Sequence, residues 1–277
     1  MRRSVWLWII ALLVTLLSAG WQRMSGPSHS LSGEGVLGGA AIHYTLERTH
    51  KGPGDQRVEI ERSPADVAGV VEWKRYGAGD PWTVVSMRRE GEGLVAELPH
   101  QPPAGKLWYR VKLTRGVETV LLPPERLAAI RFTGTVPPGI LIPHILFMFL
   151  AMFLSTRTGL EVFMPKPALR GLTYWTLGIL FVGGMVLGPF VTHYAFGPWW
   201  TGFPVGNDLT DSKMLVALIG WIAAAIAAGR SKLAKAWVVV AALVMLVIFA
   251  IPHSWTGAEP EHAQLDAASA PAAAPAR

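Results

Sequence analysis

The sequence predicts a multi-domain membrane protein: an N-terminal anchor helix, an all-β sandwich, and then an α-helical bundle that spans the membrane four times. Three observations predict this order. An apolar run follows two arginines at the N-terminus, short alternating segments occupy residues 42–136, and long apolar segments fill residues 137–255. Alternation with a period of two is typical of half-buried strands, and apolar runs of about 20 residues are typical of membrane spans.

The composition favours the same class of protein. Hydrophobic residues make up 51% of the 277 residues and charged residues only 16%, which is too apolar for an ordinary soluble protein of this size. The 12 tryptophans suit a protein with many positions at lipid–water boundaries. The absence of cysteine excludes disulfides, thiolate metal ligands and a cysteine nucleophile.

Residues 1–21 form either a membrane anchor or a cleaved secretory signal. Two arginines precede the apolar run, a pattern that both kinds of segment share. Ser18 and Gly20 are small enough for a cleavage site, whereas three tryptophans bracket the run as interfacial anchors would: Trp6, Trp8 and Trp21. The length of the run favours an anchor, and in both cases the residues that follow are exported.

Two further segments precede the apolar half of the chain. Residues 22–41 are rich in Gly and Ser and predict a flexible linker. Residues 42–136 contain eight alternating segments separated by turn residues, which predict a β-sandwich. Its core is expected to hold side chains that share one face of a strand: Val71 and Trp73 on one strand, and Leu107, Tyr109, Val111 and Leu113 on another.

This β stretch resembles immunoglobulin-like and fibronectin type III modules. Trp73 stands where such folds often bury a tryptophan, and Tyr109 is similar to their tyrosine corner. The resemblance implies a module that binds or spaces rather than one that catalyses. The scattered histidines His43, His50 and His100 are expected to be exposed, because their spacing supports no group of Ser, His and acid.

The four apolar segments cover approximately residues 139–155, 171–191, 214–229 and 236–252. The turns that follow the first and the third segment are basic, so the positive-inside rule places both in the cytoplasm. With Arg2 and Arg3 the cytoplasmic parts carry eight basic residues and one acidic residue, a charge of +7. Since the whole chain carries +6, the exported parts sum to −1, and no nucleic-acid partner is expected.

This topology predicts a protein of the bacterial inner (cytoplasmic) membrane whose surroundings are the lipid bilayer. The β domain, the 191–213 loop and the C-terminal tail, residues 256–277, are expected on the periplasmic side, with the Ala- and Pro-rich tail disordered. No predicted span carries a charge in its middle, which counts against a permease. Gly184 and Gly188 predict close approach of another helix, with four alanines as candidate partners: Ala223, Ala224, Ala227 and Ala228.

Residues 191–213, VTHYAFGPWWTGFPVGNDLTDSK, are the long polar break of the apolar half. One interpretation is an interfacial aromatic belt followed by a helix that Asp211 or Thr210 caps. The other is a surface that docks a partner protein, and the expected contacts are Trp199, Trp200, Phe203, Asp208 and Asp211.

Three histidines are expected near the outer ends of the spans: His144, His193 and His253. One interpretation is that they form ordinary hydrogen bonds at the membrane interface. The alternative is that they hold haem or copper, or that one of them contacts a quinol headgroup.

The run GPWWTGFPVGNDLTDSK, with the preceding LGPFV and the helix of His144, resembles a group of uncharacterised bacterial inner-membrane proteins. The resemblance implies that the aromatic and acidic positions form one module, and it implies no catalytic residue. The sequence therefore predicts a non-enzymatic accessory or assembly subunit, without a cofactor, that binds a protein of an envelope or respiratory complex. The alternative is a redox membrane subunit with haem or copper.

Overall fold

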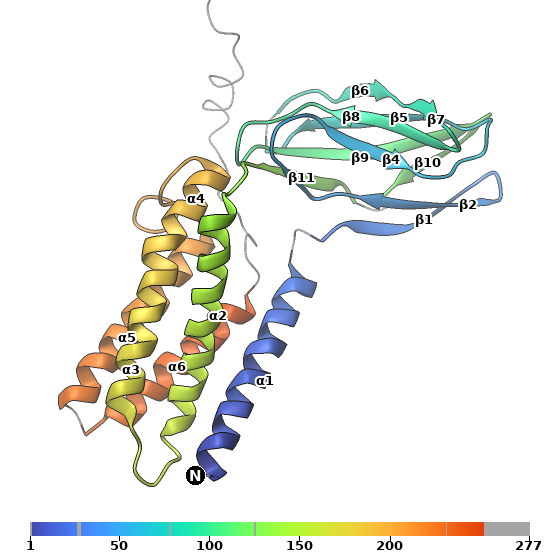
Figure 1. Ribbon diagram of the computed structural model, residues 1–277. Helices are drawn as coiled ribbons and strands as arrows, with labels where there is room; N and C mark the ends of the chain where they lie inside the picture. Colours follow the sequence, from blue (N-terminus) through green and yellow to red (C-terminus); the bar gives the residue numbers. More distant parts are fainter. Residues whose placement is uncertain (1, 27–28, 78, 125, 231, 252–277) are drawn as a thin grey trace, which may run out of the picture. The chain divides into compact units, whose positions relative to one another are not determined.

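The computed structural model describes residues 2–26, 29–77, 79–124, 126–230 and 232–251. The chain divides into a helical unit, which joins the N-terminal helix to the second half of the chain, and a β unit that contains the residues between them (Figure 1). The two units are described separately.

The β unit has three hydrogen-bonded sheets. One sheet has the order β3-β11-β9-β5-β6 with β10 beside β9, another has the order β4-β8-β7, and β1 and β2 form a hairpin. The strands are β1 Leu31–Leu37, β2 Ala40–Leu46, β3 Thr49–Lys51, β4 Gln56–Ile60, β5 Ala68–Arg75, β6 Thr83–Ser86, β7 Arg88–Glu90, β8 Gly93–Leu98, β9 Lys106–Arg115, β10 Glu118–Leu122 and β11 Ala128–Thr133.

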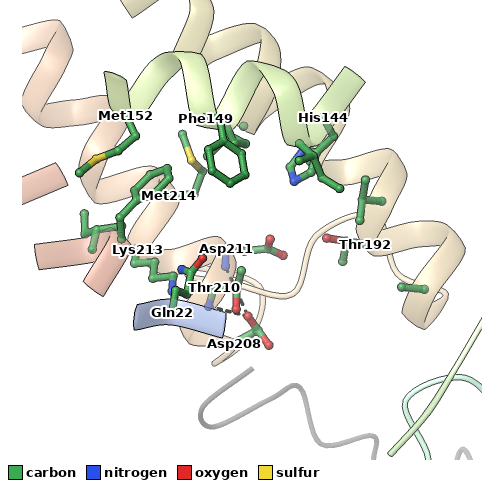
Figure 2. Close-up of a pocket in the computed structure, with 18 of the residues that line it drawn as sticks. Gln22, His144, Phe149, Met152, Thr192, Asp208, Thr210, Asp211, Lys213 and Met214 are labelled. Atoms are coloured by element: carbon green, nitrogen blue, oxygen red, sulfur yellow. Dashed lines mark hydrogen bonds between the residues drawn. The ribbon is translucent and has the colours of Figure 1, made fainter. Parts of the chain in front are cut away.

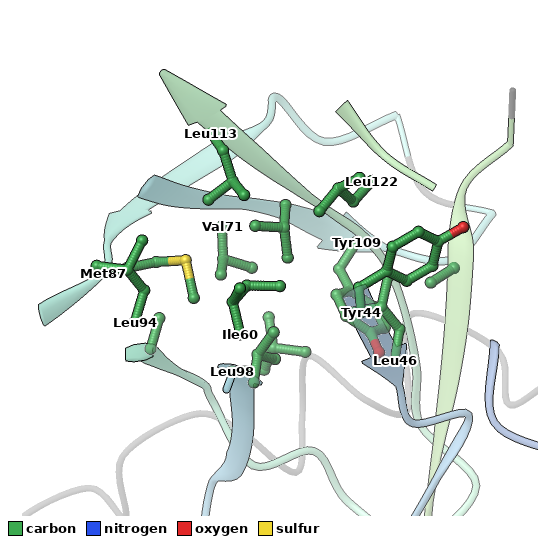
Figure 3. Close-up of a cluster of buried hydrophobic side chains, with 14 of the residues drawn as sticks. Tyr44, Leu46, Ile60, Val71, Met87, Leu94, Leu98, Tyr109, Leu113 and Leu122 are labelled. Carbon is green, nitrogen blue, oxygen red and sulfur yellow. The ribbon is translucent and has the colours of Figure 1, made fainter. Parts of the chain in front are cut away.

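One apolar core is shared by all three sheets (Figure 3). Alternate residues of β9 are fully buried in it, from Leu107 to Leu113, and so is Val71 of β5. Trp73 is half-buried and packs against this core. The alternation in the sequence therefore predicted the buried face of β9 correctly, while Trp73 is less buried than the core position expected for it.

The linker predicted over residues 22–41 is wrong for most of its length. The first helix continues to Ser25, and residues 31–37 form β1, which pairs with β2 along its whole length. Gly38 and Gly39 make the turn between these strands, with φ values of 58° and 77°. Two consecutive residues with positive φ match the twist of a hairpin, so the glycines that predicted flexibility instead make the turn.

Tyr109 does not form the expected tyrosine corner. In that motif the tyrosine hydroxyl binds backbone a few residues earlier in the chain. Here the hydroxyl donates to the carbonyl of Glu47 at 2.7 Å, which lies 62 residues earlier. The bond ties β9 to the segment after β2, and burial of the ring raises the pKa of Tyr109.

The helical unit consists of α1 Arg2–Ser25, α2 Pro138–Glu161, α3 Leu169–Leu180, the π-helix η1 Phe181–Leu187, α4 Gly188–Phe196, α5 Leu209–Arg230 and α6 Ala234–Ala250. The segments α3, η1 and α4 form one continuous helix. By length and composition, four helices in the described residues can cross a membrane: α1, α2, the continuous helix and α5. The apolar helix α6 is shorter, with 17 residues.

The glycines of the continuous helix allow close packing, but they pack against Phe147 and Met214 rather than against the alanines that the sequence suggested. A Cβ on Gly183 would lie 2.9 Å from the Cβ of Phe147 on α2, and Gly184 lies against Met214 at the start of α5. The four alanines proposed as partners lie further along α5, so that pairing was wrong. The buried interior of the unit includes Trp221, whose large side chain is fully buried.

A buried ion pair fastens the N-terminal helix at one end of the unit. Arg157 is 3% exposed and pairs with Glu161, which is 4% exposed. Arg157 also donates to the hydroxyl of Ser4 at 3.3 Å and lies over the ring of Trp8 at 4.9 Å. Glu161 accepts the N–H of Ala168 at 2.8 Å, where α3 begins. The pair, which the sequence placed in a turn, therefore belongs to α2 and links α1, α2 and α3.

Replacing Arg157 with Leu leaves the carboxylate of Glu161 buried without its cation. We expect the free energy of unfolding to fall by about 3–5 kcal/mol, as measured by denaturant unfolding of the full chain in detergent. The double variant Arg157→Leu, Glu161→Gln keeps a side-chain oxygen that accepts the N–H of Ala168, and it removes the buried charge that has no partner. It should therefore recover part of the lost free energy of unfolding. The control is Arg170→Leu, an exposed arginine with an expected change within about 0.5 kcal/mol. An Arg157 variant as stable as this control would contradict the assignment.

Candidate functional site

The loop between α4 and α5 begins at a glycine whose backbone conformation other residues rarely adopt. Gly197 has φ 97°, and its N–H donates to the carbonyl of His193 at 2.8 Å. A glycine with positive φ just after the last helical residue satisfies an otherwise unpaired carbonyl and turns the chain away. The chain then reverses over residues 198–208.

Asp208 caps the N-terminus of α5. Its Oδ1 accepts the N–H of Thr210 at 2.6 Å and the N–H of Asp211 at 3.3 Å. A carboxylate in this position satisfies two backbone donors that have no partner within the helix and lies at the positive end of the helix dipole. The expectation that Asp211 or Thr210 is the cap is therefore wrong, because the helix begins earlier than its apolar run.

Asp211 instead fastens the loop to the helix. Its Oδ2 accepts both the N–H and the hydroxyl of Thr201, each at 2.7 Å. Next to it, Ser212 accepts the N–H of Phe203 at 3.0 Å and donates to the carbonyl of Asp208 at 2.7 Å. Because these bonds join two stretches about ten residues apart, the loop lies folded against the first turns of α5.

The predicted contact residues thus divide into two groups. Asp208 and Asp211 are only 6% and 9% exposed, and they accept hydrogen bonds from the backbone N–H groups of Thr210 and Thr201. Trp199 and Phe203 are 51% and 68% exposed. Trp200 is half-buried and donates through its indole N–H to the carbonyl of Phe203 at 3.1 Å.

A cavity of about 350 Å³ lies between the helices behind this loop (Figure 2). Its lining comes from α1, α2, η1, α4, the loop, α5 and α6. The apolar wall includes Ile145, Met148, Phe149, Met152, Met214 and Ile248. The polar groups include Gln22, His144, Thr192, Thr210, Asp211 and Lys213. This volume and mixture of groups are typical of a small-molecule site.

His144 extends from α2 into the cavity, and its orientation depends on the π-helix. Its Nδ1 lies 2.9 Å from the carbonyl of Gly183. That carbonyl also accepts the N–H of Gly188 five residues later, the pattern of a π-helix. Since a carbonyl only accepts, Nδ1 carries the hydrogen, and in the neutral ring Nε2 keeps its lone pair.

Lys213 is the charged residue of the cavity lining that the sequence did not predict. It is 7% exposed and donates to the carbonyl of Ile251 at 2.7 Å, at the end of α6. The side chain of Gln22 lies 3.4 Å from the same carbonyl. A cation at a helix C-terminus satisfies a carbonyl that lacks an intrahelical donor. The signal was a lysine five residues after the capping Asp208, placed just outside the predicted span.

The structure places the two described histidines of the predicted set, His144 and His193, in different surroundings. His144 lines the cavity, whereas His193 stacks on Trp199 at 4.1 Å between ring centroids and binds the carbonyl of Gly197 through Nδ1. His253 lies outside the described residues. Within the described part of the chain, no group of three or more His, Cys, Asp or Glu side chains is arranged to hold a metal ion.

Comparison with models of protein families, with curated proteins and with solved structures finds no match for this chain. The site is therefore defined by its own geometry. It has two parts: the exposed aromatic surface of the loop, and the cavity behind it.

The cap of α5 can be tested by two substitutions at Asp208. Asp208→Ala removes the acceptor for two backbone N–H groups, so we expect the free energy of unfolding to fall by about 1 kcal/mol. Asp208→Asn keeps a side-chain oxygen that caps almost as well and should change stability by a smaller amount. Denaturant unfolding of the full chain in detergent measures both values. Equal losses for Ala and Asn would show that the negative charge, rather than the hydrogen bonds, is what stabilises the helix.

Proposed function

We propose that this chain is an integral protein of the bacterial inner membrane, with the β unit, the 191–213 loop and the C-terminus on the periplasmic side. Four helices long and apolar enough to cross a membrane support the first part. The orientation is supported by basic residues in the turns after α2 and α5 and at the helix ends beside those turns: Lys166, Arg170, Arg230, Lys232 and Lys235. The β unit, with one core shared by its sheets, is proposed as an immunoglobulin-like module.

The proposed activity is non-enzymatic: the protein is an accessory or assembly subunit that binds another protein of an envelope or respiratory complex. We define the loop face as Trp199, Phe203 and Val205, which are 51%, 68% and 78% exposed. The observation that carries the proposal is that these apolar side chains stand on a backbone held by Asp211 and Ser212. A surface whose backbone is already ordered loses little conformational entropy when it docks.

The chemistry of the loop face favours a protein over lipid headgroups as its partner. Residues 191–212 contain no Lys or Arg, and Lys213 is buried. Attraction to anionic lipids depends on such residues, so this surface lacks it. Large apolar side chains, tryptophan above all, dominate the binding energy of protein interfaces. The β unit is proposed as a second contact surface for the same partner.

Photo-crosslinking in intact membranes tests this proposal. A photoreactive phenylalanine analogue replaces Phe203 and, as a matched control, Phe163, which is 77% exposed in the turn between α2 and α3. We expect one discrete protein adduct from position 203 and none from position 163. Mass spectrometry identifies the partner. A photoreactive group placed on the contact surface of that partner should in turn form an adduct with this chain.

The substitution Trp199→Ala should weaken binding of the partner about thirtyfold and reduce the adduct at position 203 accordingly, because tryptophans at interface centres contribute about 2 kcal/mol or more. Trp237→Ala, an exposed tryptophan on α6, should leave it unchanged. Lipid adducts alone at position 203, or the same protein adduct at position 163, would contradict the proposal.

A further inference from the structure

The cavity behind the loop presents two hydrogen-bond acceptors. The Nε2 of His144 is one, because Nδ1 is committed to the carbonyl of Gly183. The other is Oδ1 of Asp211: this side chain is 9% exposed, and the hydrogen bonds described for it use Oδ2. Figure 2 shows the imidazole reaching into the cavity from α2 and the carboxylate reaching into it from α5. A polar atom held in such a place without a donor loses hydrogen-bond energy that a ligand can supply.

The rest of the cavity fits a flat apolar body. Met148, Phe149, Met152 and Met214 line it, and thioethers pack well against aromatic rings. The walls belong mainly to helices of membrane-spanning length, so a ligand that reaches them is soluble in lipid. The volume of about 350 Å³ accommodates a substituted ring and the beginning of a tail.

We propose that this cavity binds a lipid-soluble quinol. The two ring hydroxyls donate to Nε2 of His144 and to Oδ1 of Asp211, and the ring and the first part of the tail lie among the methionines and Phe149. This site is separate from the loop face and does not depend on the proposed protein partner.

The charge of the lining separates this ligand from its close alternatives. Besides His144, the described lining residues that ionise are Asp208, Asp211 and Lys213, two acids and one base. The phosphate of a lipid headgroup would add a negative charge beside two carboxylates. The carbonyl oxygens of a quinone only accept hydrogen bonds, so they would face the two acceptors without a donor between them. A dihydroxy ring is neutral and supplies both donors.

Binding to the full chain in phosphatidylcholine nanodiscs tests the proposal, under anaerobic conditions and after subtraction of binding to empty nanodiscs. We expect decylubiquinol to bind saturably with one molecule per chain. Decylubiquinone should bind at least about tenfold more weakly, because a hydrogen bond to a charged group contributes about that factor. The substitution His144→Phe should weaken decylubiquinol about tenfold.

Asp211→Asn provides the sharpest test. The amide oxygen must face the two donors of Thr201, which leaves the amide NH2 facing the cavity. An acceptor becomes a donor that a quinone carbonyl can bind, so the preference for decylubiquinol should shrink to the part that Nε2 of His144 supports. Asp208→Asn is the matched control, with the same loss of charge in the same lining, and it should keep the preference of the original protein because the oxygen of Asp208 is occupied by the helix backbone.

Three results would overturn the proposal: no saturable binding beyond that of empty nanodiscs, equal affinity for the two redox forms, or an Asp211→Asn variant with unchanged preference. Added dioleoylphosphatidylethanolamine that fills the site and resists displacement by decylubiquinol would assign the cavity to a lipid headgroup instead. If Asp211→Asn does not fold, the affinities of the original protein and of His144→Phe for decylubiquinol and decylubiquinone still test the proposal.

Discussion

In a helical unit proposed to lie in a membrane, every backbone N–H and C=O that leaves the helical pattern must find a partner in the chain itself, since hydrocarbon supplies none. The described structure meets this constraint with side chains. Glu161 binds the backbone where α3 begins, and His144 binds the carbonyl in the π-helix. Asp208 and Asp211 bind the backbone around the loop, and Lys213 binds the end of α6.

The constraint also explains why the loop and the cavity belong together. The polar side chains that satisfy the backbone near the loop come from the same turns of α2 and α5 that line the cavity. Asp211 and His144 each use one polar atom for the backbone, which fixes the side chain and aims its second atom at the enclosed space. The hydrogen bonds that Asp211 and His144 make to the backbone therefore also orient the atoms that are proposed to bind the quinol. The hydrogen bonds of Asp211 to Thr201 also hold the loop backbone in place, so Asp211 contributes to both proposed sites.

Much of this architecture is readable in the sequence, because it depends on local periodicity. Alternation identified the strands and the buried face of β9, and apolar runs identified the helices and the polar break between them. The hairpin of β1 was missed, since composition suggested flexibility where two glycines make a turn. The start of α5 was missed for a related reason. Its first residues are polar, and the rule that counts apolar residues begins the helix at Met214 rather than at Leu209.

The remaining features depend on contacts between distant parts of the chain. The bond between His144 and Gly183 requires that α2 pack beside a π-helix, and nothing in the local pattern around position 183 specifies that neighbour. Lys213 lies just outside the predicted span of residues 214–229, yet it reaches the end of α6. Arg157 looked like a cytoplasmic charge, yet it holds Ser4 and Trp8. In each case the residue type was visible, and only the fold supplies the partner.

Residue-resolved amide exchange of the full chain in nanodiscs tests the central claim, that side chains of α5 hold the loop backbone. The N–H groups of Thr201 and Phe203 donate to Asp211 and Ser212, whereas that of Asn207 has no described acceptor. The account predicts that the amides of Thr201 and Phe203 exchange slowly, on the timescale of the first turns of α5, while that of Asn207 exchanges fast. Exchange of Thr201 and Phe203 as rapid as that of Asn207 would contradict it.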